Sequence, residues 1–228
     1  MGIHREFSRF AQEYRRLNRV QSEVIEHIMG DCYTEPKSIL DLGCGSGAVA
    51  NELDWEVEKF IGVDFSGAML EMHPQDDKIT TIEADFNDEA TFTKLKEYTF
   101  DAVISASALQ WAKDLDKIFA HINELAPSAG LALFTSNTFR TLHAVADIDS
   151  PIHSREAIID AAKRQFKNPE IQTESYQIRF KDKKSLFSYI KKSGVSGGNK
   201  VLNISQMRAL MRDYPLDYLE FEVAYINV

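Results

Sequence analysis

The chain has 228 residues, 44% of them hydrophobic, and a formal net charge of −9 at pH 7. This length and apolar content suit one domain with a substantial core, and the acidic balance argues against general affinity for nucleic acids. No stretch approaches ~18 consecutive apolar residues, and the N-terminus lacks the basic, apolar and small-residue order of a signal peptide, so we expect a cytoplasmic protein without a membrane partner.

Apolar residues at helical spacing from Phe7 to Ile28 predict a helix of roughly 20 to 25 residues before the first strand. Apolar strand patterns and helical patterns then alternate, which predicts a parallel sheet covered by helices on both faces. Strands are expected at 39–41, 60–64, 79–83, 100–105 and 131–135. The later pattern predicts a helix near 154–166, an alternating run at 176–180, a flexible loop at 194–198 and a terminal strand near 219–225.

The most informative motif follows the first predicted strand, where Asp41 precedes glycines at alternate positions. Gly43, Gly45 and Gly47, with the small residue Cys44 among them, allow a sharp turn and a close approach between backbone and ligand. A dinucleotide fold instead uses Gly-x-Gly-x-x-Gly to bring a pyrophosphate onto a helix N-terminus. The spacing therefore predicts a nucleoside site and disfavours a dehydrogenase.

Two further carboxylates end the next two predicted strands. Asp64, followed by Phe65, comes about twenty residues after the glycines, at the position that reaches the ribose hydroxyls in a doubly wound sheet. Asp85 and Phe86 follow the third strand, where a carboxylate can accept from an adenine amino group and an aromatic ring can pack on the base. Each alone is typical of a helix cap or loop, but together they favour a ligand at the carboxyl edge of the sheet.

Small residues follow the fourth predicted strand, from Ser105 to Ala108, and leave room for a ligand and a second substrate. Gln110 adds a hydrogen-bonding amide, and Trp111 adds either a broad apolar wall or an ordinary core side chain. Neither cysteine, Cys32 or Cys44, has the partner spacing of a zinc or redox motif, and the six histidines are scattered. We therefore expect no metal.

The glycine motif resembles motif I of class I methyltransferases, which use S-adenosylmethionine (SAM). Nearly end to end, the chain also resembles the BioC family, the malonyl-[acyl-carrier-protein] O-methyltransferases of biotin synthesis. The likeness rests on Phe7-Ser8-Arg9-Phe10-Ala11-x-x-Tyr14, Val20-Gln21, Asp41 to Gly47, Leu109-Gln110-Trp111, Thr141-Leu142-His143, Lys192-Ser193-Gly194-Val195 and Tyr214-Pro215-Leu216-Asp217-Tyr218. This chain is compact after the fifth strand, where members of the family carry a short helix-rich insertion.

The resemblance implies an α/β fold: a Rossmann-like, doubly wound, mostly parallel seven-stranded sheet with a terminal antiparallel strand and an N-terminal helical lid. It implies a single domain over 1–228, with the lid at 1–30, a SAM-binding core at 38–136 and substrate-side elements at 137–228. SAM is the implied cofactor and S-adenosylhomocysteine its product. The implied SAM contacts are Gln21, Asp41, Gly43, Cys44, Gly45, Gly47, Asp64, Phe65, Asp85, Phe86 and Ser105.

The implied reaction methylates the free carboxylate of malonyl-acyl-carrier protein, an early step towards the pimeloyl chain of biotin. A carboxylate has a reference pKa near ~4 and is already ionised at neutral pH, so no general base is expected. Arg140 is the first candidate to hold it, because a guanidinium matches a carboxylate in a planar fork; a surface role for Arg140 is equally compatible, and Arg155 is a weaker alternative. Gln110 is a second positioning candidate, and Tyr14 and Gln21 are candidates for the lid.

Charge is divided unevenly along the chain. Residues 1–150 hold 13 basic and 26 acidic residues, a net charge of −13, whereas 151–228 hold 13 and 9, a net charge of +4. The basic clusters are Lys163-Arg164, 181–184 and Lys191-Lys192. Such clusters are typical of solvated helix faces, and the alternative is a docking surface for an acidic carrier protein. We expect a monomer.

Two other functions stay open. A methyltransferase of this fold can act on another small carboxylic acid or a coenzyme A thioester, because the donor site does not specify the acceptor. A SAM-binding regulatory or partner subunit without turnover is the alternative outside enzymes. Methyl transfer to malonyl-carrier protein separates these possibilities.

Overall fold

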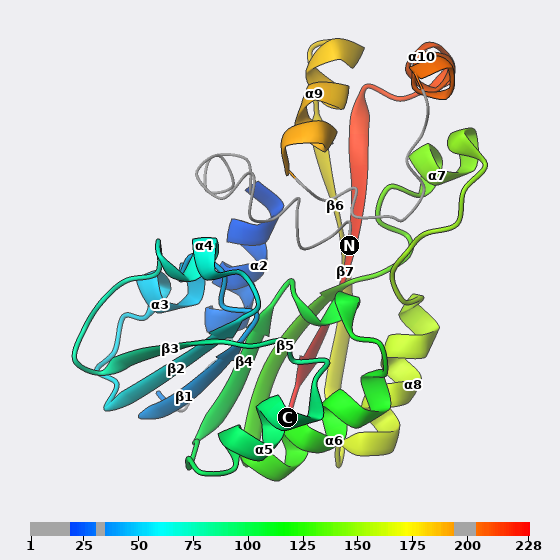
Figure 1. Ribbon diagram of the computed structural model, residues 1–228. Helices are drawn as coiled ribbons and strands as arrows, with labels where there is room; N and C mark the ends of the chain where they lie inside the picture. The colour runs from blue at the N-terminus through cyan, green and yellow to red at the C-terminus, as the bar shows by residue number, and fades with distance from the viewer. Residues whose placement is uncertain (1–18, 31–34, 194–203) are drawn as a thin grey trace.

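The computed structural model describes residues 19–30, 35–193 and 204–228 (Figure 1). Of the predicted N-terminal helix, α2 (Arg19–Gly30) is described. Tyr14 and the predicted loop at 194–198 lie outside the described residues. No helix within the described ranges is long and apolar enough to cross a membrane.

Seven strands form one sheet in the order β3-β2-β1-β4-β5-β7-β6. Their bounds are β1 Ser38–Leu42, β2 Lys59–Asp64, β3 Ile79–Glu83, β4 Ala102–Ala106, β5 Ser128–Phe134, β6 Glu170–Arg179 and β7 Tyr218–Asn227. Strands β1 to β5 are joined by parallel pairings, and β7 runs antiparallel to both of its neighbours. The predicted strands and the antiparallel terminal strand are confirmed, and β7 lies between β5 and β6.

The helices described besides α2 connect these strands or extend beyond them. They are α3 Ala48–Glu52, α4 Gly67–Leu70, α5 Glu89–Leu95, the 3-10 turn η1 Leu109–Trp111, α6 Leu115–Leu125, α7 Arg140–Ala146, α8 Arg155–Gln165, α9 Lys183–Ser193 and α10 Ile204–Asp213. The helix predicted near 154–166 is confirmed as α8. It begins where the Ser154 side chain accepts a hydrogen bond from the Ala157 amide, which satisfies one free amide of the first turn.

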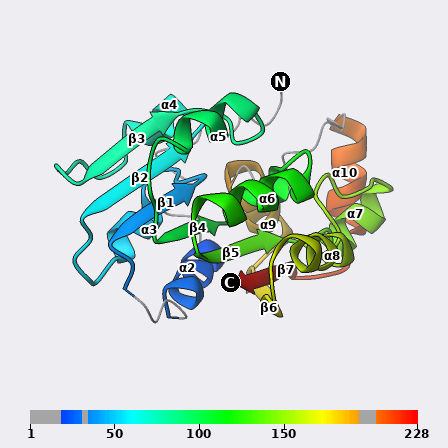
Figure 2. The same ribbon diagram turned by 90° about the horizontal axis from the view of Figure 1, so that it is seen from below.

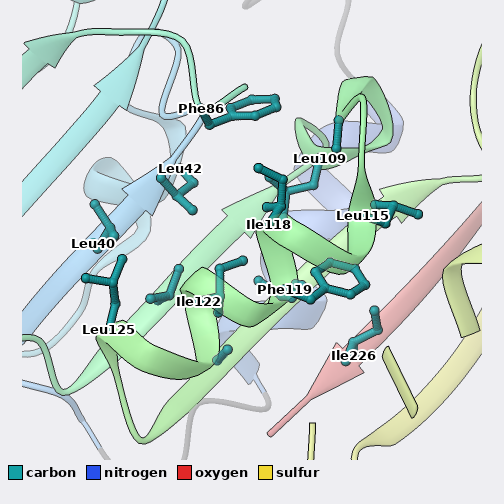
Figure 3. Close-up of a cluster of buried hydrophobic side chains, with 14 of the residues drawn as sticks. Leu40, Leu42, Phe86, Leu109, Leu115, Ile118, Phe119, Ile122, Leu125 and Ile226 are labelled. Atoms are coloured by element: carbon teal, nitrogen blue, oxygen red, sulfur yellow. The ribbon is translucent and has the colours of Figure 1, made fainter. Parts of the chain in front are cut away.

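Alternate side chains of the central strands pack into two separate layers. Leu40 and Leu42 of β1 lie in a cluster with Ile118, Phe119 and Ile122 of α6, which Figure 3 shows together. This layer also takes in residues of α5 and α8. Figure 2 shows α5 and α6 on one side of the sheet and α2 on the other. The period of two along a strand therefore assigns consecutive residues of β1 to opposite faces.

The second layer covers the other face. Ile39 packs there with Val24 of α2 and Val49 of α3, and with apolar side chains of α7, α9 and α10. Figure 1 shows α7, α9 and α10 beyond the carboxyl end of β5 and the start of β7. The chain order along the sheet reverses between β1 and β4, and in doubly wound sheets ligands bind in the crevice outside that reversal.

Candidate active site

A cavity of about 490 Å³ opens at this reversal point. Its volume is within the range of about 300–1,000 Å³ that is usual for small-molecule sites. The walls come from the loops that follow β1, β2, β3 and β4, and from one side of α2 and α3. The carboxyl edge of the sheet thus brings together segments that are far apart in the sequence.

The glycine loop after β1 is shaped by its protein neighbours at two positions. Gly43 and Gly47 have φ of +79° and +80°, and a Cβ on them would overlap Ala108 and Pro74, respectively. At Gly45 the nearest atom to such a Cβ is the Met69 methyl carbon, at 3.8 Å. Gly43 and Gly47 are therefore required by packing, whereas Gly45 keeps the loop open where it lines the cavity.

Asp64, at the end of β2, is held firmly in the cavity wall. Its Oδ2 accepts a hydrogen bond from the Gly45 amide at 3.0 Å, and its Oδ1 accepts one from the Ser66 amide at 2.8 Å. A carboxylate has about four lone-pair positions, so both oxygens can still accept from a ligand hydroxyl. Phe65 lines the cavity beside it.

The loop after β3 carries a second ordered carboxylate. Asp85 Oδ1 accepts from the Asn87 amide at 2.8 Å and from its side-chain nitrogen at 3.0 Å. The Asn87 side chain also accepts a hydrogen bond from the Lys113 amide at 2.7 Å, which joins this loop to the segment after β4. Asp85, Phe86 and Asn87 all line the cavity, and the Asp85 bonds use only Oδ1.

Asp41 lies within the sheet just before the glycine loop, with 1% of its surface exposed. Neither of its oxygens has a hydrogen-bond partner among the residues that the structure describes. Burial, followed by the nearby Asp64, raises the pKa of its carboxyl well above its usual range. Burial, followed by the carboxyl groups of Asp41 and Asp64, raises the pKa of the Cys44 thiol, which disfavours its thiolate form.

The cavity as a whole is acidic. Its described side chains include three carboxylates, Glu52, Asp64 and Asp85, and one ammonium, Lys113. SAM carries a cationic sulfur and an ammonium group, so this charge distribution suits it. The residues present therefore fit the implied cofactor.

Of three other residues predicted for the site, one lines the cavity and two do not. Gln21 of α2 does line the cavity, with 7% of its surface exposed, and its Oε1 has no hydrogen-bond partner in the described ranges. Ser105 does not: its hydroxyl points across the sheet and donates to the Leu42 carbonyl at 2.6 Å. Gln110 is also turned inward, where its side-chain nitrogen donates to the Ser107 carbonyl at 2.7 Å. Both side chains donate to backbone carbonyls, while Gln110 Oε1 is buried without a partner among the described residues.

The structure does not bring Arg140 to the cavity. This residue begins α7, is 70% exposed in its side chain, and donates to Glu220 of β7 at 3.1 Å. Arg155 is tied similarly, with Glu156 at 3.0 Å and Glu222 at 3.9 Å. Gly47 and Asp41 also lie outside the cavity lining, because one packs on Pro74 and the other is enclosed in the sheet.

The sequence patterns did not identify two sets of residues that line the cavity: one face of α3, and the pair Asn87 and Lys113, which joins the loops after β3 and β4. Ala48, Asn51 and Glu52 line the cavity from α3, and their spacing of three and four residues places them on one helix face. That spacing is the signal that would have found them. Asn87 and Lys113 carry no such signal, because their hydrogen bond joins loops from different strands.

Comparisons with known proteins agree with this site. The family described as "Methyltransferase domain" matches residues 40–134, the segment that supplies most of the cavity wall. A malonyl-[acyl-carrier protein] O-methyltransferase of Legionella pneumophila is 25% identical over 98% of this chain and 88% of its own length. The same-named protein of Geobacter sulfurreducens is 31% identical over 62% of this chain and 56% of its own length.

A solved structure, the YcgJ protein of Bacillus subtilis, shares the fold. It superimposes with a TM-score of 0.64 at 13% identity, covering 90% of this chain and 97% of its own. The strand order and the acidic cavity at the reversal point agree with the likeness to the Legionella protein, which extends over 98% of this chain. The chain therefore has the fold of class I methyltransferases, matches a methyltransferase domain at residues 40–134, and is similar in sequence to malonyl-[acyl-carrier protein] O-methyltransferases.

Proposed function

We propose that this protein methylates the free carboxylate of a malonyl group on an acyl-carrier protein, as an early step of pimeloyl formation for biotin. The observation that carries the proposal is the likeness to the Legionella protein over 98% of the chain. The acidic cavity supports the donor half of the reaction, because its carboxylates suit a cationic methyl donor.

Bound SAM would supply a methyl group on a positively charged sulfur. Asp64 would accept hydrogen bonds from the ribose hydroxyls, and Asp85 Oδ2 would accept from the adenine amino group. Phe65 and Phe86 would provide apolar contacts to the base. Gln21, with an unpaired side-chain oxygen, would accept from the amino-acid end.

The residues of the site need not move a proton. An ionised carboxylate donates an electron pair to the methyl carbon, forming the C–O bond, while the C–S bond breaks and its electron pair stays on sulfur. The products are a neutral ester and a neutral thioether. The work left to the protein is to hold the two reactants in line and to exclude water, and Trp111 on the cavity wall serves the second purpose.

A basic cap at the carboxyl side of the sheet would dock the carrier. We define this cap as Lys181, Lys183, Lys184, Arg208 and Arg212, all exposed on or beside α9 and α10. Lys183 donates to the Arg212 carbonyl at 2.8 Å, which joins the two helices. Asp182 and Asp213 offset part of the charge, and the balance remains positive. Acyl-carrier proteins are acidic, so a positive surface would steer them towards the site.

The test of the reaction is transfer of label from SAM to malonyl-carrier protein, with acetyl-carrier protein as the matched control that lacks the free carboxylate. We expect label on the malonyl form alone. Equal label on malonyl-coenzyme A would favour the alternative of a thioester enzyme without a carrier requirement. SAM binding without any label would contradict the proposed acceptor and revive the non-catalytic alternative.

The basic cap is tested by charge reversal. Lys183→Glu combined with Lys184→Glu should raise KM for malonyl-carrier protein roughly tenfold, because steering and docking both weaken, and should leave the Kd for SAM unchanged. Lys163→Glu combined with Lys167→Glu makes the same charge change at and after the end of α8, away from the cap, and serves as the control. An equal effect of the two pairs would contradict docking on the cap.

A further inference from the structure

The turn after β4 contains a serine in a backbone conformation that serine rarely adopts. Ser107 has φ of +64°, in the left-handed region. Its amide donates to the Ala132 carbonyl at 2.9 Å, and its carbonyl accepts from the Gln110 side chain at 2.7 Å. Next to it, Ala108 packs on Gly43 so closely that no Cβ fits between them. The surrounding structure therefore holds the strained residue firmly in place.

Ser107 lines the cavity, yet its hydroxyl has no hydrogen-bond partner among the described residues. Trp111, four residues further on, also lines the cavity and has an unpartnered indole N–H. Both groups are hydrogen-bond donors shielded from solvent, and leaving such donors unpaired is unfavourable. Rotation about its Cα–Cβ bond lets the serine hydroxyl reach a ligand. Two unpaired donors on one turn suit a group that only accepts hydrogen bonds, such as a carboxylate.

Within the part of the chain that the structure describes, no tightly held cation competes for this role. Lys113 is the basic side chain among the described lining residues, and it is exposed. Arg140 and Arg155 pair with glutamates of β7. Neutral donors also suit the reaction, because methyl transfer removes the negative charge of the acceptor. A strong ion pair would stabilise the charged ground state more than the transition state, where that charge is partly lost.

We infer that the Ser107 hydroxyl, together with the Trp111 indole N–H, binds the carboxylate of the methyl acceptor. The inference rests on the proposed function for the identity of that acceptor. SAM has a carboxylate of its own at its amino-acid end, with the same hydrogen-bonding chemistry. Separate measurements of donor and acceptor binding distinguish the two sources.

The experiment uses three variants of one residue. Ser107→Ala removes the hydroxyl and keeps the backbone strain, Ser107→Gly removes both, and Ser107→Asn tolerates the left-handed conformation and restores a donor. We expect Ala and Gly to raise KM for malonyl-carrier protein by about ten- to a hundredfold, the usual value of a hydrogen bond to a charged group, with Asn recovering part of the loss. Trp111→Phe should act in the same direction, and Ser175→Ala on β6 is the control.

Donor binding is measured in parallel by titration calorimetry. The Kd for SAM should change less than about twofold in all Ser107 variants, since one hydrogen bond to a charged group is worth more than that. A selective loss of SAM affinity would overturn the inference, because the hydroxyl would then serve the donor. Wild-type kinetics in Ser107→Gly would also overturn it, because the serine would then matter only for its backbone.

A binding measurement separates this inference from the proposed function. With S-adenosylhomocysteine bound, the wild-type protein should bind malonyl-carrier protein more tightly than acetyl-carrier protein, and the Ser107→Ala variant should lose that preference. Failure of the wild-type protein to prefer or methylate the malonyl form would refute both proposals. Methylation by the wild type with an unchanged preference in the variant would refute the serine's role alone.

Discussion

The glycine loop offers a sharp test of how packing, rather than ligand contact, selects its residues. A Cβ at Gly47 would overlap the Pro74 ring and lie 2.9 Å from His73 Cδ2, and φ there is +80°. A left-handed alanine costs about 1–2 kcal/mol, and forcing extra volume into a packed site adds about 1–3 kcal/mol. We therefore expect Gly47→Ala to lower the free energy of unfolding by about 2–5 kcal/mol.

Gly45→Ala is the matched comparison, because φ is also positive there, at +53°, while the nearest atom is a flexible methionine end at 3.8 Å. Only the backbone cost of about 1–2 kcal/mol applies. For a chain of this size, 1 kcal/mol corresponds to roughly 2–4 °C in Tm, so the expected losses are roughly 4–20 °C for Gly47→Ala and roughly 2–8 °C for Gly45→Ala. Gly30→Ala, with open space around it, should leave Tm unchanged or slightly raised.

Thermal unfolding without ligand measures these losses, and calorimetric titration with SAM measures the Kd. Gly45→Ala should weaken SAM binding more than its small stability loss suggests, because Gly45 lines the cavity and Gly47 does not. If Gly45→Ala lowers Tm as much as Gly47→Ala does, the contact with Pro74 does not explain the glycine. The packing argument for this loop would then be wrong.

Three further predictions concern charge and order of binding. Burial raises the pKa of Asp41, so the contribution of its protonated carboxyl to stability is complete below the ordinary pKa of 3.8 and is lost as pH rises through the folded-state pKa. The Tm of Asp41→Asn should therefore rise relative to that of the wild type from pH 4 upwards. A Tm difference that does not depend on pH would contradict this reasoning. Asn87→Ala should raise the Kd for SAM about five- to thirtyfold in calorimetry by releasing Asp85 and the Lys113 amide, whereas an unchanged Kd would show that the loop is held by other contacts. Because the cavity wall is acidic, malonyl-carrier protein should bind at least roughly tenfold more weakly in calorimetry before SAM or S-adenosylhomocysteine is present, and equal affinities would rule out this electrostatic order.

The order of the elements and two of the carboxylates that line the cavity could be read from the amino-acid sequence. Short runs with apolar and β-branched residues, bounded by turns, are typical of strands, so both the buried strand β2 and the less buried edge strand β3 could be placed locally. Asp64 and Asp85 follow from those strand ends, because residues at the carboxyl ends of parallel strands meet at one edge. Gln21 was expected at the site from the family resemblance, and it lines the cavity from α2.

Tertiary structure alone decided where several polar side chains of the site point. Ser105 donates to the Leu42 carbonyl and Arg140 pairs with Glu220, because hydrogen-bond partners distant in sequence compete for these groups. Gln110 donates to the nearby Ser107 carbonyl, in a turn held by contacts with the glycine loop and β5. The conformation of Ser107 likewise depends on Ala132, a residue of the neighbouring strand. Local patterns record which residues prefer burial or a turn, whereas the partner that each polar group finds depends on strands and loops brought together only by the folded sheet.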